Sequence, residues 1–228
     1  TYYGGGANDE GGSVITDANG NLFVTGNTAA TNFPTLNPGG GAYFQGTKNG
    51  TWDTYLLKFD NLGNRLWATY FGGSGFEAYK EYTYDNLAVD DCGNVYMSVE
   101  TASTDVPTLQ ACDNGFYNSA YNGGSYDMFI TQFSNTGVYR WGTYLGGDGD
   151  DFRTPIAIDN DNSLFVSGEW TDGSPINPAT YPLTNPGGGS YNNTFTGGHD
   201  GLMSKFTKTV PTLSVTPVNA TCGCTGSA

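Results

Sequence analysis

Acidic side chains recur at two places in the sequence, and they are the first residues that could carry chemistry. One set stands ahead of a short turn motif and the other ahead of an apolar run; the members are Asp17, Asp90 and Asp159, and Asp53, Asp127 and Asp200. Because such side chains accept hydrogen bonds from nearby backbone amides, turn capping is the first interpretation of both sets. Cation binding and paired-carboxylate catalysis are the alternatives.

Two acidic segments have alternating oxygen-bearing residues of the kind that bind calcium. They are "GGDGDD" at 146–151 and "DNDNS" at 159–163. A calcium ion takes six to eight oxygen ligands, so we name Asp159 and Asp161 as candidate metal ligands. The second segment lacks the central glycine and the distal glutamate of an EF-hand loop. Calcium is the one cofactor that the sequence suggests, and turn capping is the alternative role of these aspartates.

Residue types typical of active sites are sparse. The single histidine, His199, precedes a recurrent aspartate where Trp52 and Tyr126 stand elsewhere, which favours a structural role over catalysis. The sequence has no cysteine–histidine pairing at a known spacing and no HExxH motif. A glycosidase-type carboxylate pair stays open, because its separation cannot be deduced from sequence. Glu10, Glu77 and Glu100 share no position in the repeat, so they do not identify such a pair. We expect a protein that is not an enzyme.

Aromatic side chains in the long connections are candidates for ligand binding. Tyr43, Tyr117 and Tyr191 head this group, which also includes Phe44, Tyr121 and Phe195. Such rings could stack on sugars, or they could pack beneath the connections as small satellite clusters.

Four cysteines are present, and two of them suggest a disulfide. Cys92 and Cys112 lie in one part of the chain and have no counterparts elsewhere, so a local Cys92–Cys112 bridge is the simplest pairing. Cys222 and Cys224 are too close for an easy mutual bridge, and a strained bridge or partners elsewhere stay open.

Composition excludes several classes of partner. The 228 residues carry a net charge of −14, with no cluster of Lys or Arg, which opposes binding to nucleic acid and to anionic membranes. No segment approaches the roughly 20 apolar residues of a membrane span. Aromatic residues reach 14%, charged residues only 13%, and 35 residues are glycine, which favours short strands joined by turns.

One unit occurs three times and must position these residues. Its Thr-Tyr anchors, at Thr1, Thr69 and Thr143, are 68 and 74 residues apart. Each unit continues with an alternating pair of segments around a turn, then a linker of about 25 residues, then a third segment. In the first two units a second turn and a Trp-bearing segment follow, as in "NLGNRLWATY". Each unit therefore predicts up to four strands, with Trp67 and Trp141 packed between units and glycine pairs as pivots.

Fixed-period units of four strands are typical of β-propeller blades, because one blade cannot bury both of its faces alone. We predict an all-β fold of three blades at approximately 1–68, 69–142 and 143–208. Three blades are fewer than a closed propeller has, so upstream blades, association of chains or an open array with capping partners would complete it.

The segments "WATYFGGSG", "LAVDDCGNVYMS", "TDVPT" and "GGSYDMFITQFSNTG" resemble the SBBP-type β-propeller repeat of secreted and surface bacterial proteins. The similarity covers roughly residues 1–208. It departs from the family pattern at 14–17, in the long linkers, and at Asn162–Ser163, where the pattern has Gly-Asn. The resemblance implies blades in extracellular proteins, often adhesive, with no general catalytic motif to transfer. The segment "VNATCGCTGSA" at 218–228 weakly resembles the opening strand of β-sandwich repeats in gliding-motility adhesins, and we expect residues 209–228 to be a linker and the start of a further module.

We therefore expect a non-enzymatic, extracellular or cell-surface module with a structural or adhesive role. Its expected partners are other domains or copies of the same surface protein, with glycans as a further option. The alternatives are a carbohydrate-binding or carbohydrate-cleaving propeller and a subunit of an extracellular filament.

Overall fold

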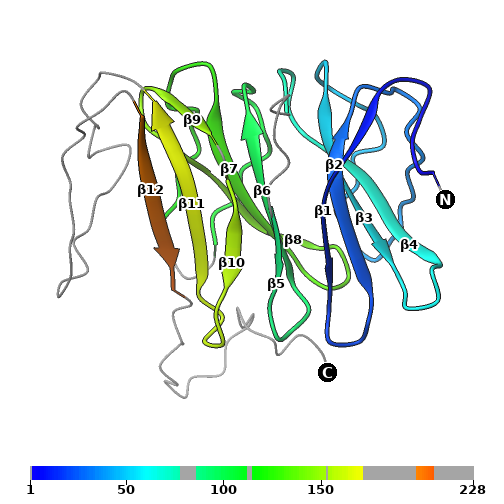
Figure 1. Ribbon diagram of the computed structural model, residues 1–228. Helices are drawn as coiled ribbons and strands as arrows, with labels where there is room; N and C mark the ends of the chain where they lie inside the picture. The colour runs from blue at the N-terminus through cyan, green and yellow to red at the C-terminus, as the bar shows by residue number, and fades with distance from the viewer. Residues whose placement is uncertain (1, 78–85, 112–114, 153, 172–198, 208–228) are drawn as a thin grey trace.

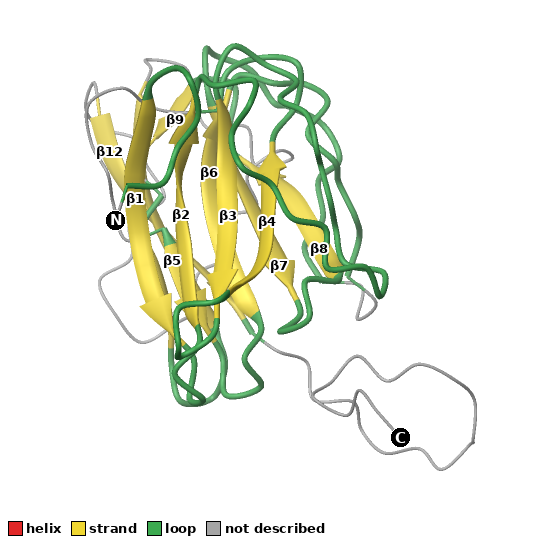
Figure 2. Cartoon of the chain, turned by 90° about the vertical axis from the view of Figure 1, so that its right-hand side faces the viewer, coloured by secondary structure: helices red, strands yellow, loops and turns green. Residues whose placement is uncertain are grey.

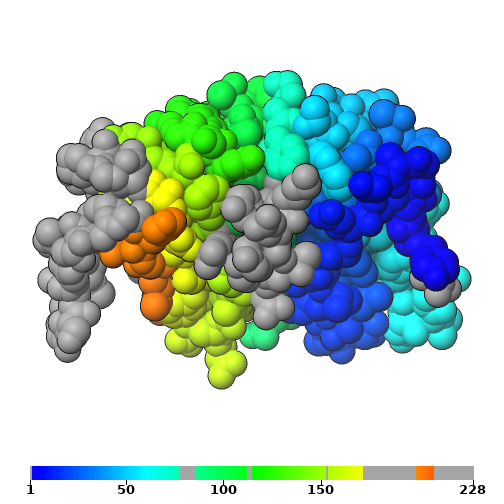
Figure 3. Space-filling model, turned by 45° about the horizontal axis from the view of Figure 1, so that its top comes forward, coloured from blue at the N-terminus to red at the C-terminus, as the bar shows by residue number. Residues whose placement is uncertain are grey.

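The computed structural model describes residues 2–77, 86–111, 115–152, 154–171 and 199–207. These residues form three four-stranded antiparallel sheets and contain no helix (Figure 2). The sheets follow one another in chain order across the molecule (Figure 1), and the space-filling view shows the same order from blue to orange (Figure 3). The all-β blade architecture predicted from the repeats is confirmed. The three sheets do not close into a ring.

Each sheet is one blade, whose strands run outward from an inner strand. Blade 1 contains β1 (Asp9–Thr16), β2 (Leu22–Thr28), β3 (Asp53–Phe59) and β4 (Arg65–Phe71). Blade 2 contains β5 (Leu87–Val89), β6 (Val95–Thr101), β7 (Asp127–Phe133) and β8 (Tyr139–Leu145). Blade 3 contains β9 (Asp150–Phe152), β10 (Ile156–Ile158), β11 (Leu164–Thr171) and β12 (His199–Phe206). In blade 3 both β9 and β10 pair with β11, so they divide the place of the inner strand, and β12 is the last described strand of the sheet.

The turn between the first two strands of each blade depends on the recurrent aspartate. Asp17 Oδ1 accepts hydrogen bonds from the amides of Asn19 and Asn21, both at 2.9 Å. Gly20 supplies the left-handed conformation that the turn requires, with φ at 76°. Blade 3 has Asn162 at this place, with φ at 58°, and asparagine tolerates this region better than most residues. The turn-capping interpretation is confirmed for this set of aspartates.

The end of each outer strand crosses into the next blade. Phe71 is the last residue of β4, yet its ring lies 5.9 Å from Phe129 and 5.8 Å from Phe133 in blade 2. The ring of Trp67, four residues earlier in β4, lies 5.4 Å from the ring of the same Phe133. Both side chains are buried in one cluster shared by blades 1 and 2. The prediction that the tryptophan packs between blades is confirmed.

The linkers of blades 1 and 2 lie along the outer strand of their own blade. Leu36 exchanges two backbone hydrogen bonds with Ala68 in β4, and Leu109 does the same with Gly142 in β8. A second segment of the first linker follows, where the Tyr70 amide donates to the Gln45 carbonyl at 3.1 Å. These backbone bonds hold both described linkers against the edge of their sheet.

Truncation of Phe71 should measure how strongly the blades hold one another. Phe71→Ala removes a fully buried ring from the junction, and such substitutions lower the free energy of unfolding by about 3–5 kcal/mol. The matched control is Leu62→Ala in the exposed β3–β4 turn, where we expect a change within about 0.5 kcal/mol. Urea denaturation followed by tryptophan fluorescence checks both values. A loss at Phe71 no larger than at Leu62 would contradict packing between blades.

Candidate functional site

A carboxylate follows the glycine pair at the start of each blade, and in blades 2 and 3 it is buried. The residue four positions after the second glycine is acidic in every unit: Asp9, Glu77 and Asp151. Strand pairing places Asp9 and Asp151 equivalently, since Asp9 pairs with Thr28 in β2 and Asp151 pairs with Trp170 in β11. Glu77 matches Asp9, because the residue before each accepts a backbone hydrogen bond from the residue after the second long strand, Ala102 or Ala29. The position holds Asp in two units and Glu in one, so a comparison of glutamates alone does not reveal it.

At the first junction Glu77 meets an aspartate from the preceding blade. Glu77 Oε1 accepts hydrogen bonds from the hydroxyls of Thr101, at 2.8 Å, and Ser103. Asp53 accepts from the amides of Asn49 and Gly50 and from the side chain of Gln45; the last distance is 2.7 Å. Both acids are fully buried. This confirms turn capping for Asp53, but the residue also forms half of a carboxylate pair.

Gly72 separates the two carboxyl groups of this pair. A β-carbon at Gly72 would lie 2.4 Å from Glu77 Oε2 and 3.1 Å from Asp53 Cγ, so the space admits no side chain. The blades are also joined through the backbone here, because the Glu77 amide donates to the Trp52 carbonyl at 3.0 Å. The glycine of the predicted pivot is therefore required by the close approach of two acids.

The second junction repeats this arrangement with Asp127 from blade 2 and Asp151 from blade 3. Asp127 Oδ2 accepts from the Asn122 amide at 2.6 Å, and Asp151 Oδ2 accepts from the Gly147 amide at 2.9 Å. The other oxygen of each carboxyl, Oδ1, is buried without a protein hydrogen-bond partner. A β-carbon at Gly146 would lie 2.7 Å from Asp151 Oδ2 and 2.9 Å from Asp127 Oδ1.

Burial raises the pKa of these acids far above the usual carboxyl range. The pKa of Asp151 rises to about 8, mainly through burial and then through the charge of Asp127, while the Gly147 amide opposes the rise. Burial raises the pKa of Asp127 to about 7 and that of Glu77 to about 7, against the hydrogen bonds that each accepts. The charge of Asp53 adds to the rise at Glu77. Each pair therefore retains a proton in weakly acidic solution.

This geometry allows proton binding but gives a substrate no access, since the four paired acids are fully buried. Among the residues that the structure describes, no group of three or more His, Cys, Asp or Glu side chains is placed to hold a metal ion. The pairs act as internal polar contacts between blades, because each brings one acid from each side of a junction.

The candidate calcium ligands lie in the hairpin turn of blade 3. Asp159 Oδ1 accepts from the amides of Asp161 and Ser163 at 2.9 and 2.8 Å, which repeats the turn of blade 1. Asp159 Oδ2 also lies 3.7 Å from Lys205 Nζ. The Asp161 side chain is exposed. Calcium at Asp159 and Asp161 stays a prediction.

The aromatic candidates have different surroundings. Tyr43 packs against Phe71, Phe133 and Tyr139, with ring centroids 5.6–5.7 Å away, and its carbonyl accepts from Trp67 Nε1. Its ring therefore belongs to the packing between blades 1 and 2.

Tyr117 is half-buried and donates its hydroxyl hydrogen bond to Thr108 Oγ1 at 3.1 Å. Tyr191 lies outside the described residues. Glycan binding by Tyr117 and Tyr191 stays a prediction.

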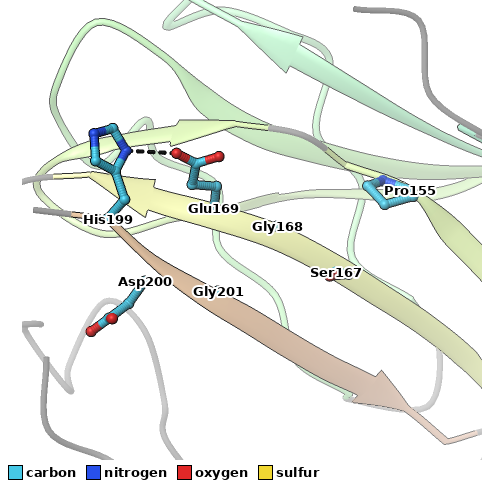
Figure 4. A pocket seen from close by; sticks show the side chains of 7 residues that line it. All are labelled: Pro155, Ser167, Gly168, Glu169, His199, Asp200 and Gly201. Atoms are coloured by element: carbon cyan, nitrogen blue, oxygen red, sulfur yellow. Dashed lines mark hydrogen bonds and ion pairs between the residues drawn. The ribbon is translucent and has the colours of Figure 1, made fainter. Parts of the chain in front are cut away.

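Cys92 is disulfide-bonded. Its predicted partner Cys112 lies outside the described residues, as do Cys222 and Cys224, so the pairing stays a prediction. His199 begins β12 and forms a 2.6 Å contact between its Nδ1 and Glu169 Oε1. Both residues line an open hollow of about 370 Å³ on blade 3 (Figure 4).

The carboxylate pairs predict that stability falls as pH rises. Unfolded carboxyls titrate near 4, whereas Glu77, Asp127 and Asp151 titrate near 7–8 in the folded protein. The folded state binds more protons between these values, so the contribution is fully present below about pH 4 and is lost through about pH 7–8. Because one pKa unit corresponds to about 1.4 kcal/mol, the free energy of unfolding should fall by several kcal/mol between about pH 5 and 8.5. Urea denaturation at both pH values measures it.

Substitution separates this effect from the general repulsion of an acidic protein. Asp151→Asn removes one titrating carboxyl of the second junction and should flatten the pH dependence. Asp91→Asn removes the same formal charge from an exposed position and should leave the pH dependence as in the wild type. Equal slopes in the two variants would show that the junction acids do not cause the dependence.

A family model described as SBBP, beta-propeller repeat, matches residues 1–34. A search of curated proteins finds no match. Within the described part of the chain, no helix has the length and apolar character to cross a membrane. The matched segment contains β1 and β2, and blades 2 and 3 repeat its strands and turns in the same order. The chain therefore has the architecture of β-propeller blades, and the segment that holds β1 and β2 is similar to the SBBP repeat.

Proposed function

We propose that this chain is a non-enzymatic structural and adhesive module of an extracellular or cell-surface protein. The observation that carries the proposal is the use of its recurrent polar residues. Asp17, Asp90 and Asp159 cap turns, while Asp53 and Asp127 pair with acids across the junctions. These side chains form the turns of the blades and the contacts between them, and none of the paired acids lies on the surface for a substrate.

The disulfide at Cys92 supports a location outside the cell. Disulfides persist in oxidising compartments and are rare in the cytosol. The net charge of −14 supports partners other than nucleic acid and anionic lipid, namely other domains or copies of the same surface protein.

The surface available for adhesion consists of the outer edges of the blades and their linkers. In the first linker the segment from Asn37 to Gly41 is exposed, and Gly39, Gly40 and Gly41 all have φ values of 64–82°. Such a glycine run presents backbone groups that a protein partner can bind. Because Tyr43 packs between the blades, a protein contact is better supported than sugar stacking in this linker.

The extracellular proposal predicts a protected thiol. In protein secreted into an oxidising compartment, Cys92 should resist alkylation in denaturant until a reductant is added. If Cys112 is the partner, mass spectrometry of a digest should identify the linked peptides. Reduction should then lower the free energy of unfolding by roughly 3 kcal/mol, the value for a loop of this order. Alkylation of Cys92 without reductant would contradict the proposal.

The protein-contact proposal predicts no specific signal on a glycan array. Wild-type protein and Phe44→Ala are the matched pair, because the Phe44 ring is the more exposed neighbour of Tyr43. Background binding by both is the expected result. A glycan signal in the wild type that Phe44→Ala or Tyr117→Ala abolishes would favour the carbohydrate-binding alternative instead.

A further inference from the structure

Blade 3 exposes a face that the other two blades bury. The middle residue of the third strand is Leu56 in blade 1 and Ile130 in blade 2. The following blade covers both side chains completely. Strand pairing places Met203 of β12 at the same position, opposite Ser167. Met203 is 77% exposed. An apolar side chain thus lies on the surface at the place where its counterparts form the junction.

Neighbouring positions on this face follow the same pattern. Ser98 in β6 donates its hydroxyl hydrogen bond to the Thr154 carbonyl of the following blade. The equivalent Ser167 in β11 is exposed and lines the hollow together with Glu169, His199 and Pro155 (Figure 4). The hollow is therefore located where the next blade lies in the rest of the molecule.

Blade 1 exposes the opposite half of such a junction. Leu87 in β5 and Ile156 in β10 are buried against the preceding blade, with exposures of 4% and 6%. Pairing with β2 places Val14 of β1 at the same position, and Val14 is 62% exposed. Blades 1 and 3, which carry these two exposed residues, lie at opposite ends of the row of blades (Figure 1).

Blade 3 carries one partner of each polar contact of a junction, and blade 1 carries the other. Asp53 and Asp127 each meet the acid of the next blade, and Asp200 of blade 3 holds their place in the repeat. The matching acid is Asp9 of blade 1, which is half-buried. Similarly, Lys58 Nζ donates to the Asn135 carbonyl in the next blade at 2.7 Å. The corresponding residues at the two ends are Lys205 and Asn61.

We propose that the Met203 face of blade 3 docks on the Val14 face of blade 1 in a second copy of this chain. The contact reproduces a junction that the molecule already contains twice, so the shape and chemistry of its occupant are known from blades 1 and 2. The pairing brings Asp200 to Asp9. The backbone carbonyl of His199 then accepts from the Asp9 amide, as the Trp52 carbonyl accepts from the Glu77 amide within the chain. Two copies of three blades, joined head to tail through two such contacts, close a ring of six blades, which is within the range of known propellers.

The mass of the purified chain in solution tests this proposal, which does not depend on an extracellular location. Light scattering after gel filtration should give twice the 24.1 kDa of one chain. Met203→Glu and Val14→Glu should each give the monomer mass, because each variant damages both contacts of the ring. Leu109→Glu, an exposed substitution in the linker of blade 2, which belongs to neither docking face, should retain the dimer. Circular dichroism confirms that each variant is folded.

Mixing the variants distinguishes head-to-tail docking from any symmetric contact. One Met203→Glu chain and one Val14→Glu chain still share one undamaged interface, so an equimolar mixture should recover the dimer mass that neither variant gives alone. A wild-type monomer, or a mixture that stays monomeric, would overturn the proposal. A mass that grows beyond the dimer with concentration would overturn the closed ring, since it indicates an open filament.

Discussion

Phe71 ends the outer strand of blade 1 but packs on Phe129 and Phe133 of blade 2, and this crossing determines much of the structure. A single four-stranded sheet has two faces and too few residues to cover either. The crossing brings the next sheet close enough to bury Trp67 between them. It also requires a chain without side chains at the crossing point, which explains the glycine pair. The crossing therefore sets where the strands of the next blade begin.

The crossing forces two acids together at each junction. Burial of a charged carboxylate is costly, and two adjacent charges increase that cost. The protein reduces it with hydrogen bonds to Glu77 Oε1 and Asp53, and with a proton in weakly acidic solution. The interior of this strongly acidic protein is consequently less charged than its sequence implies. Polar groups at a junction also fix one relative position of the sheets, which apolar packing alone would fix less sharply.

Much of the fold could be predicted from sequence because the same pattern of strands and turns occurs three times. Turn residues such as Gly20, and Trp67 ahead of a glycine pair, depend on local geometry and on one period, so their roles were evident. The partner of an acid depends on contacts between blades, which no local pattern reveals. Asp53 was correctly assigned to a turn, while its pairing with Glu77 was missed. Comparison of acidic character across the units, rather than of residue identity, would have found it.

The linkers illustrate a second limit of sequence analysis. Their glycine and asparagine content predicts loops, and the bonds from Leu36 to Ala68 involve only the backbone, which no side-chain pattern records. Tyr43 was placed among candidate surface aromatics for the same reason. Its burial depends on blade 2, and specifically on Phe133 and Tyr139, almost a hundred residues further along the chain.

The glycine pivot and its two acids also bear on how such proteins change in evolution. Each unit carries both halves of a junction, one acid near its start and another at its third strand. Both junctions therefore use the same two positions, and one of these positions holds Glu in one junction and Asp in the other. Duplication or loss of a whole unit leaves the remaining junctions chemically complete. Gene rearrangements that respect the glycine pair can lengthen or shorten the array without redesign of its neighbours.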